Sequence, residues 1–102
     1  MQIVALSGDL MDRSRLTSAF AQVAFGTDAD ACAGADVVIV DLARFAVLVA
    51  ELRRRLPSAR IVAYGAHVDD GALAAALDAG ADAAVPRSRF FRDPAAAIAA
   101  SG

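Results

Sequence analysis

Residues 36–42 read DVVIVDL: four consecutive β-branched apolar side chains stand between two aspartates. An apolar run without alternation is typical of a strand that is covered on both faces, as in parallel sheets. Two further runs share this character, and two shorter ones are weaker candidates for strands. The full set is Gln2–Ser7 (QIVALS), Val23–Gly26 (VAFG), Asp36–Leu42, Arg60–Tyr64 (RIVAY) and Asp82–Val85 (DAAV).

Helix signals fill the gaps between these strands. The clearest stripe has apolar residues at positions 45, 48, 49, 52 and 56, and Pro57 then ends the helix. Aspartates suited to N-capping precede other segments, and Gly80 is placed to follow a helix end. We therefore expect helices over residues 9–21, 28–33, 45–56, 71–79 and 94–100.

Strict alternation of strands and helices with short connections predicts an α/β fold. Such chains form a doubly wound parallel sheet with right-handed crossovers and helices on both faces. The length of 102 residues fits a single domain over residues 1–102 with five strands.

The composition excludes several classes of function. The net charge is −2, and the basic residues are ten arginines with no lysine, so an extended basic surface for nucleic acid is not expected. The chain has 27 alanines, but no apolar run approaches the length of a membrane span. The single cysteine, Cys32, fits a reducing compartment and small-residue packing. We expect a cytoplasmic protein.

Polar residues gather where the predicted strands end. Ligands of open α/β sheets bind beyond the carboxyl ends of the strands. The residues at these ends are Ser7-Gly8-Asp9, Asp41, Gly65-Ala66-His67 and Arg87-Ser88-Arg89.

Three stretches resemble the receiver domain of bacterial two-component response regulators: residues 2–16 (QIVALSGDLMDRSRL), Asp41 at the end of the third strand, and Gly80–Phe90 (GADAAVPRSRF). The resemblance covers essentially the whole chain. It implies a flavodoxin-like fold with strand order 2-1-3-4-5. It also implies a phosphoryl acceptor after strand three, two acids for Mg²⁺ after strand one, a Ser or Thr after strand four and a Lys after strand five.

Only part of that site matches. Asp41 stands at the acceptor position, but Ser7 and Gly8 replace the acid pair, with Asp9 one residue further on. Gly65 replaces the hydroxyl residue, and Arg87, which is no equivalent of lysine, replaces the lysine. The expected pocket is thus Ser7, Gly8, Asp9, Gly65, His67 and Arg87 around Asp41. Asp9 and Asp41 alone are weak Mg²⁺ candidates.

Structural roles are the first expectation for several of these residues. Asp41 is expected to pair with Arg87 across the sheet, and Asp9 to cap the first helix. The lone His67 is expected to hydrogen-bond backbone or to begin a helix. Gly8 and Gly65 could leave room for a bound anion beside helix amides.

The adjacent pair Phe90 and Phe91 predicts an interaction surface. Two consecutive aromatics cannot easily both enter a core, so one is expected to stay exposed. In receivers the corresponding face, here residues 71–79, 82–85 and 94–100, is the usual dimer or partner surface. We expect a protein partner or a homodimer there, and no nucleic acid or membrane.

Three functions follow as hypotheses. The first is a stand-alone pseudo-receiver that signals through protein contacts, without a cofactor and without enzymatic activity. The alternative is a working receiver phosphorylated on Asp41, which would use Mg²⁺. A further alternative is a domain that binds a small anion or small molecule at the strand ends.

Overall fold

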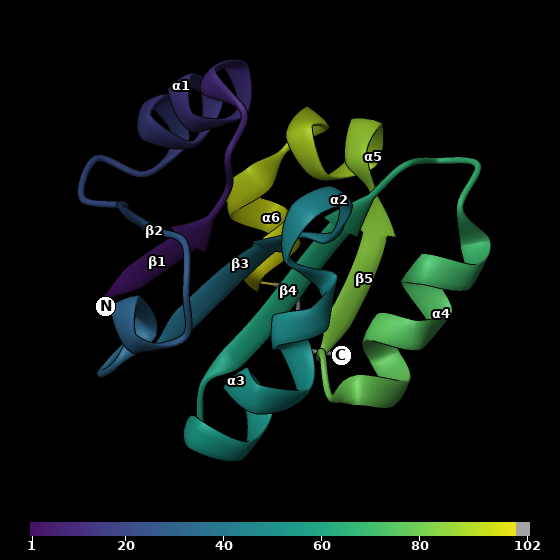
Figure 1. Cartoon of the computed structure of the whole chain (residues 1–102). Coiled ribbons are helices and arrows are strands. Elements are labelled where there is room, and N and C mark those ends of the chain that lie inside the picture. Colours follow the sequence, from purple (N-terminus) through teal and green to yellow (C-terminus); the bar gives the residue numbers. More distant parts are fainter. Residues whose placement is uncertain (100–102) are drawn as a thin grey trace.

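The computed structural model describes residues 1–99, which form five strands and a series of short helices (Figure 1). The strands are β1 (Ile3–Leu6), β2 (Ala24–Gly26), β3 (Val37–Asp41), β4 (Arg60–Gly65) and β5 (Ala83–Pro86). The α-helices are α1 (Leu10–Ala19), α2 (Leu42–Phe45), α3 (Val49–Arg55), α4 (Asp70–Ala79), α5 (Arg87–Arg92) and α6 (Pro94–Ala99). Two 3₁₀ turns, η1 (Asp30–Cys32) and η2 (Ala46–Leu48), complete the set.

All strand pairs are parallel, and the sheet order is β2-β1-β3-β4-β5. Every residue of β1 and β3 is buried, as the continuous apolar runs of the sequence indicate. The predicted doubly wound α/β fold and its strand order 2-1-3-4-5 are confirmed.

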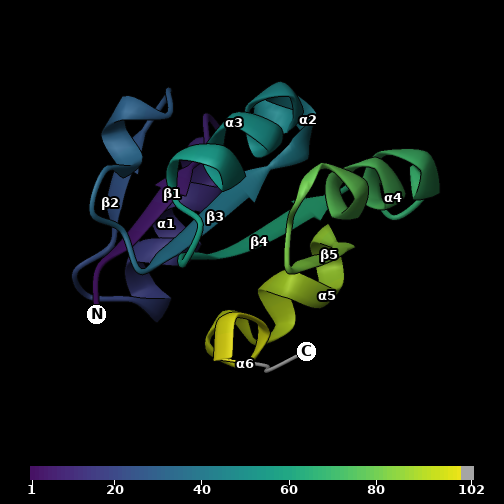
Figure 2. The same cartoon turned by 90° about the horizontal axis from the view of Figure 1, so that it is seen from below.

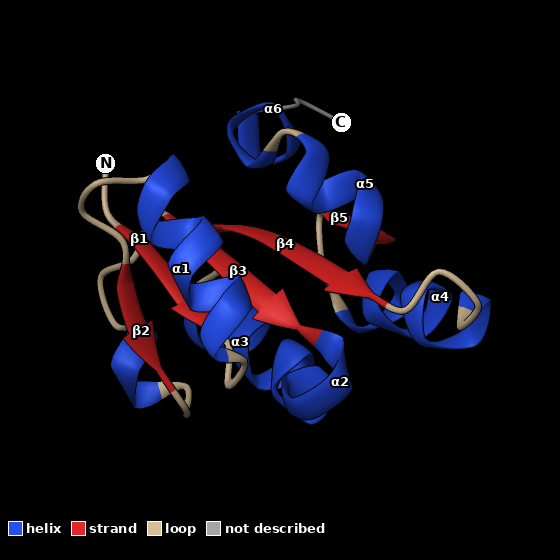
Figure 3. Cartoon of the chain, turned by 90° about the horizontal axis from the view of Figure 1, so that it is seen from above, coloured by secondary structure: helices blue, strands red, loops and turns tan. Residues whose placement is uncertain are grey.

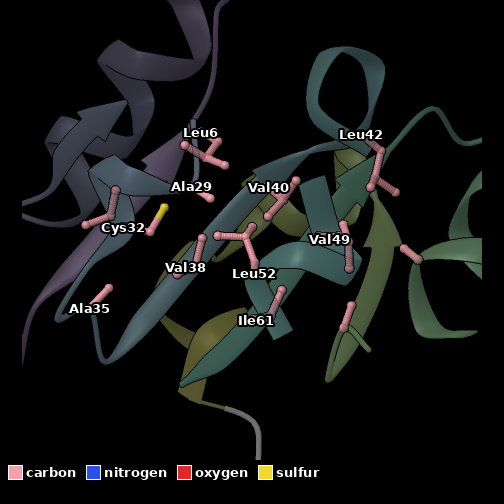
Figure 4. Close-up of a cluster of buried hydrophobic side chains, with 14 residues drawn as sticks. Leu6, Ala29, Cys32, Ala35, Val38, Val40, Leu42, Val49, Leu52 and Ile61 are labelled. Carbon is pink, nitrogen blue, oxygen red and sulfur yellow. The ribbon is translucent and has the colours of Figure 1, made fainter. Parts of the chain in front are cut away.

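Side chains alternate between two apolar layers, one on each face of the sheet. In β3, Val38 and Val40 join Leu52 of α3 in the first layer (Figure 4), whereas Ile39 joins Leu16 of α1 and Phe90 of α5 in the second. The helices α2, α3 and α4 lie on one side of the sheet and α5 and α6 on the other (Figure 2). The molecule thus has three layers. Because all strands are parallel, their carboxyl ends lie at the same edge of the sheet.

Two predicted helices differ from the structure, and one observed helix was not predicted. The segment 45–56 keeps its apolar stripe, with Val49 and Leu52 fully buried, but it consists of the last residue of α2, the 3₁₀ turn η2 and the helix α3. The segment 28–33 shortens to the three residues of η1. The sequence pattern did not predict α5, because the polar-rich RSRFFR lacks a repeating apolar stripe and lies between Pro86 and Pro94.

At the opposite edge of the sheet, Arg53 of α3 links the segments that precede β4 and β5. Its guanidinium donates to the carbonyl oxygens of Gly80 and Ala59, both at 2.9 Å, and to the Asp82 carboxylate at 2.6 Å. Gly80 ends α4 with a φ of +121°, and a Cβ there would lie 2.7 Å from Cγ of Arg53. Only glycine meets both requirements.

Across residues 1–99, none of the helices is both long and apolar enough to pass through a membrane.

Candidate functional site

The ends of β1, β3, β4 and β5, which carry the predicted pocket residues, lie at one edge of the sheet (Figure 3). Ser7 follows β1, Asp41 ends β3, Gly65 ends β4 and Arg87 follows β5. Ser7 and Asp41 are buried, with exposed fractions of 3% and 4%. This edge is where open α/β sheets place their ligands.

A bidentate ion pair between Arg87 and Asp12 dominates the site. Both terminal nitrogens of Arg87 donate to the two carboxylate oxygens of Asp12. The Asp12 side chain is fully buried, while 38% of the Arg87 side chain is exposed. The pair joins the first turn of α1 to the beginning of α5 across the strand ends. Because bidentate guanidinium–carboxylate pairs are strong and directional, Arg87 has a fixed position.

Tyr64 of β4 is the third member of this network. Its hydroxyl donates to the Asp12 carboxylate at 2.9 Å and lies 3.3 Å from Oγ of Ser7. The Arg87 guanidinium lies over the Tyr64 ring, 5.7 Å from its centroid, and over the Phe91 ring at 5.3 Å. Burial is the main reason that the pKa of the Tyr64 hydroxyl is raised. The hydroxyl therefore acts as a fixed donor to Asp12.

Asp41 does not pair with Arg87, so this expectation is wrong. The Asp41 carboxylate turns toward its own chain and accepts a hydrogen bond from the Ala43 N–H at 3.1 Å, which caps α2. Arg87 extends over Tyr64 instead and reaches Asp12. Burial raises the pKa of the Asp41 carboxyl, and the negative charge of Asp12 raises it further; the Ala43 hydrogen bond and the charges of Arg87 and Arg44 act in the opposite direction.

Arg44 covers the edge of the sheet beside Gly8. A Cβ at Gly8 would lie 2.7 Å from Nη1 and 2.9 Å from Cδ of Arg44. The absence of a side chain at position 8 therefore lets Arg44 lie against the backbone that follows β1. A second guanidinium thus occupies the site, in addition to that of Arg87.

Gly65 is closely surrounded by leucines. Its Cβ position is 3.3 Å from Cδ1 of Leu42 and 3.4 Å from Cδ2 of Leu73. His67, in contrast, is exposed in the loop that leads to Asp69, the N-cap of α4. The predicted anion space beside Gly65 is therefore lined by leucine side chains, and His67 lies outside the buried network.

Asp9 has the predicted capping role. Its carboxylate accepts hydrogen bonds from the N–H groups of Met11 at 2.8 Å and Asp12 at 3.0 Å. These bonds, led by the one from Asp12, lower the pKa of the Asp9 carboxyl despite some desolvation. Ser7 also lines a surface hollow of about 280 Å³ on the β2 side, together with Arg13, Phe25, Gly26 and Thr27.

Asp12 is the site residue that the sequence reasoning missed. Asp12 lies one turn before Leu16 on the same face of α1. Both side chains are fully buried. An acidic residue on the apolar face of a helix was the available signal, and Arg87 is its partner.

The carboxylates of this edge are already engaged. Asp12 binds Arg87, Asp41 accepts from Ala43, and Asp9 caps α1. Within residues 1–99, His, Cys, Asp and Glu side chains form no group of three or more that could hold a metal ion. The arrangement can hold charges in fixed positions and orient the ends of α1 and α5.

The Phe90–Phe91 pair lies differently from the prediction. Phe90 is fully buried and stacks on Tyr64 with ring centroids 5.0 Å apart, so it cannot contact a partner. Phe91 is half-buried, edge-on to the same ring at 5.0 Å, and Arg15 lies over its face at 5.5 Å. Both aromatics enter the core because the turn from β5 into α5 brings them to Tyr64.

Asp41→Asn is expected to raise the melting temperature at neutral pH. The pKa of Asp41 is higher in the folded chain than its unfolded value of about 3.9. Ionisation therefore disfavours the fold: the stability is complete below the unfolded pKa and falls as the pH rises through the folded pKa. Asparagine keeps the cap to Ala43 without the charge. Thermal unfolding measures the gain, and each kcal/mol in a domain of this size corresponds to roughly 4–8 °C.

Asp82→Asn is the matched control and has the opposite sign. Burial alone would raise the pKa of Asp82, but hydrogen bonds from the Ile61 N–H and Arg53 outweigh it and lower the pKa. Its contribution is present at neutral pH and is lost as the pH falls through the folded pKa. The variant should therefore melt lower at neutral pH and approach the wild type in acid. A lower melting temperature for Asp41→Asn at neutral pH would contradict the assignment for Asp41.

Structural comparison identifies the fold. A response regulator receiver domain protein from Clostridium thermocellum gives a TM-score of 0.79 at 16% identity, over 96% of this chain and 90% of that one. A response regulator from Burkholderia pseudomallei, with a phosphorylated aspartic acid, a calcium ion and citrate, gives 0.79 at 18% identity, over 95% and 65%. The CheY-like protein TadZ from Pseudomonas aeruginosa gives 0.72 at 22% identity, over 86% and 87%. The chain has the fold of response regulator receiver domains.

No family model matches the sequence, and no curated protein matches it. The likeness at these identities therefore establishes the fold, and the chemistry has to be argued from the site itself.

Proposed function

We propose that this chain is a receiver-like signalling module that acts through protein contacts and is not phosphorylated on Asp41 in the Mg²⁺-dependent way. It would belong to two-component signal transduction in a bacterial cytoplasm, in line with its single buried free cysteine. The proposal rests on the receiver fold together with the state of the carboxyl edge.

The Arg87–Asp12 pair is the observation that carries this proposal. A hard Mg²⁺ ion needs several free oxygen ligands, and phosphoryl transfer needs a cation that can follow the transferred charge. Here the buried carboxylate of Asp12 is already neutralised by Arg87 at close range. Gly65 offers no hydroxyl, so the phosphoryl-sensing residue that receivers carry after strand four has no equivalent.

A non-enzymatic role follows in this proposal. The residues of the edge hold one another: Asp12 with Arg87, and Asp41 with the Ala43 N–H. Side chains whose donors and acceptors are paired with one another are better suited to a structural role than to proton transfer. We therefore propose no cofactor, and a protein as the partner, either another protein or a second copy of the chain.

Phosphorylation of Asp41 is the second candidate, and Asp12 supports it. The Asp12 carboxylate lies near enough to Asp41 for its charge to raise the pKa of Asp41. Were Arg87 to release Asp12, its carboxylate and that of Asp41 would be two oxygen ligands at this edge of the sheet, which is the beginning of a Mg²⁺ site.

Beryllofluoride with Mg²⁺ separates the two candidates, because this mixture imitates the phosphoryl group of an acyl phosphate. Amide NMR spectra of the wild type should not change at Leu42, Ala43 or Ala66 under conditions that shift a phosphorylatable receiver measured in parallel. Shifts centred on Asp41 that disappear in Asp41→Asn would refute the proposal and establish the second candidate.

A further inference from the structure

A hollow between β5, α5 and α6 is the feature that the site described above does not use. It has a volume of about 310 Å³. Its lining residues come from one face of β5 and from the two C-terminal helices: Ala83, Val85, Arg89, Arg92, Asp93, Ala96 and Ala97. Figure 3 shows α5 and α6 next to β5.

Small side chains explain why this hollow is present. Ala83, Val85 and Ala97 are partly buried and pack against the second apolar layer, so the floor of the hollow is a thinly covered part of the core. The helix α6 contributes only methyl groups at positions 96 and 97. A single branched or aromatic side chain from outside could occupy the space and bury apolar surface on both sides.

The rim of the hollow is positively charged. Arg89 and Arg92 lie one turn apart on α5, and both are exposed. Within residues 1–99 neither one makes an ion pair or lies over an aromatic ring, unlike Arg53, Arg55 and Arg87. The one carboxylate on the rim, Asp93, is engaged in capping α6 through the Ala96 N–H at 3.2 Å. The rim therefore has a net charge of +1 and two free guanidiniums.

We propose that this hollow docks an acidic segment of a partner protein that inserts one apolar side chain beside at least one carboxylate. The apolar floor accepts the side chain, and Arg89 and Arg92 bind the acidic flank. The inference rests on the proposed function, since it specifies the chemistry of the protein contact named there.

A second copy of this chain fits the hollow poorly. In a two-fold symmetric dimer the same patch meets itself, which would bring Arg89 and Arg92 of both copies together. Like charges across an interface disfavour association. The patch also supplies alanines rather than a protruding apolar side chain, so it cannot fill its own hollow.

A peptide titration tests the proposal. The probe is acetyl-EELEE-amide, followed by amide NMR on the full chain, with acetyl-KKLKK-amide and acetyl-EEGEE-amide as controls. We expect shifts centred on Ala83, Val85 and Ala97 with the first peptide only. Arg89→Gln and Arg92→Gln should each weaken binding about two- to fivefold, as for exposed ion pairs. Arg54→Gln, which removes another exposed arginine, on α3, should change it less than about twofold.

Filling the hollow supplies an independent variant. Ala96→Leu keeps the rim charges and alters an exposed position, so the fold should be retained, and we expect binding to weaken about tenfold. Equal binding of the lysine peptide, an Arg54→Gln effect as large as that of Arg89→Gln, or no shifts at β5 would overturn the proposal. So would self-association in light scattering that Arg89→Gln abolishes, because the occupant would then be a second copy. None of these results depends on the beryllofluoride outcome at Asp41.

Discussion

Arg87→Met is expected to lower the free energy of unfolding by about 3 kcal/mol, because it leaves the buried Asp12 carboxylate without its cation. The loss should fall at the lower end of the range for buried pairs, since 38% of the Arg87 side chain is exposed. Among residues 1–99, the Tyr64 hydroxyl would remain as the one side-chain donor to Asp12, and one neutral hydrogen bond does not compensate a buried charge. Urea denaturation of both proteins measures the difference.

The double variant Asp12→Leu/Arg87→Met is the decisive companion. It removes both charges together, so we expect it to recover most of the stability that Arg87→Met loses. The Tyr64 hydroxyl would keep Ser7 as its partner. Arg54→Met serves as the control for removing an exposed arginine and should change the stability by less than about 0.5 kcal/mol. A loss below about 1 kcal/mol for Arg87→Met would place the pair with solvent-screened surface bridges.

Phe90→Ala is expected to cost about 3–5 kcal/mol, which is the range for deleting a buried phenylalanine. Phe90 is fully buried, and its ring contacts two others: it stacks on Tyr64 and is edge-on to Phe91, with both centroid separations 5.0 Å. Removal leaves a cavity beside Tyr64 and Phe91 and also removes the aromatic contacts with both rings. Thermal or denaturant unfolding at neutral pH reports the change.

Phe91→Ala tests whether the loss of stability in Phe90→Ala comes from the burial of the side chain or simply from the loss of an aromatic ring. The two residues are adjacent and of the same type, but Phe91 is only half-buried. Its truncation should therefore cost about 1–2 kcal/mol, in proportion to the smaller apolar area that it removes from water. Equal losses for the two variants would contradict the difference in burial, and a larger loss for Phe91 would reverse the assignment of the core residue.

The strands were predictable because each of the central ones is covered on both faces. Residues 37–40 are apolar at every position, and all four are β-branched, which favours a strand over a helix. The interruption of segment 45–56 was not predictable in the same way. Its apolar spacing is that of one helix, and the spacing is retained although the backbone tightens into a 3₁₀ turn at residues 46–48.

The sequence predicted where the site residues lie better than it predicted which side chains pair with one another. The strand-end rule identified Ser7, Asp41 and Arg87, and all three lie at the carboxyl edge. The partner of Arg87 could not be chosen from strand ends alone, because Asp12 lies on a helix and reaches the edge only when α1 packs on the sheet through Leu16. Which acid meets an arginine depends on side-chain reach across three elements, which local sequence patterns do not encode.

Gly65 determines how a hydroxyl could return to this edge of the sheet. Receivers carry a Ser or Thr at this position, and a Cβ here would lie 3.3 Å from Cδ1 of Leu42 and 3.4 Å from Cδ2 of Leu73. The contact with Leu73 is ordinary packing, whereas the contact with Leu42 requires that side chain to shift by a few tenths of an ångström. A Gly65→Ser substitution is therefore accommodated only as far as the Leu42 side chain can move without leaving its rotamer. The readiness of position 65 to regain a hydroxyl is thus set by a leucine that takes no part in phosphoryl chemistry.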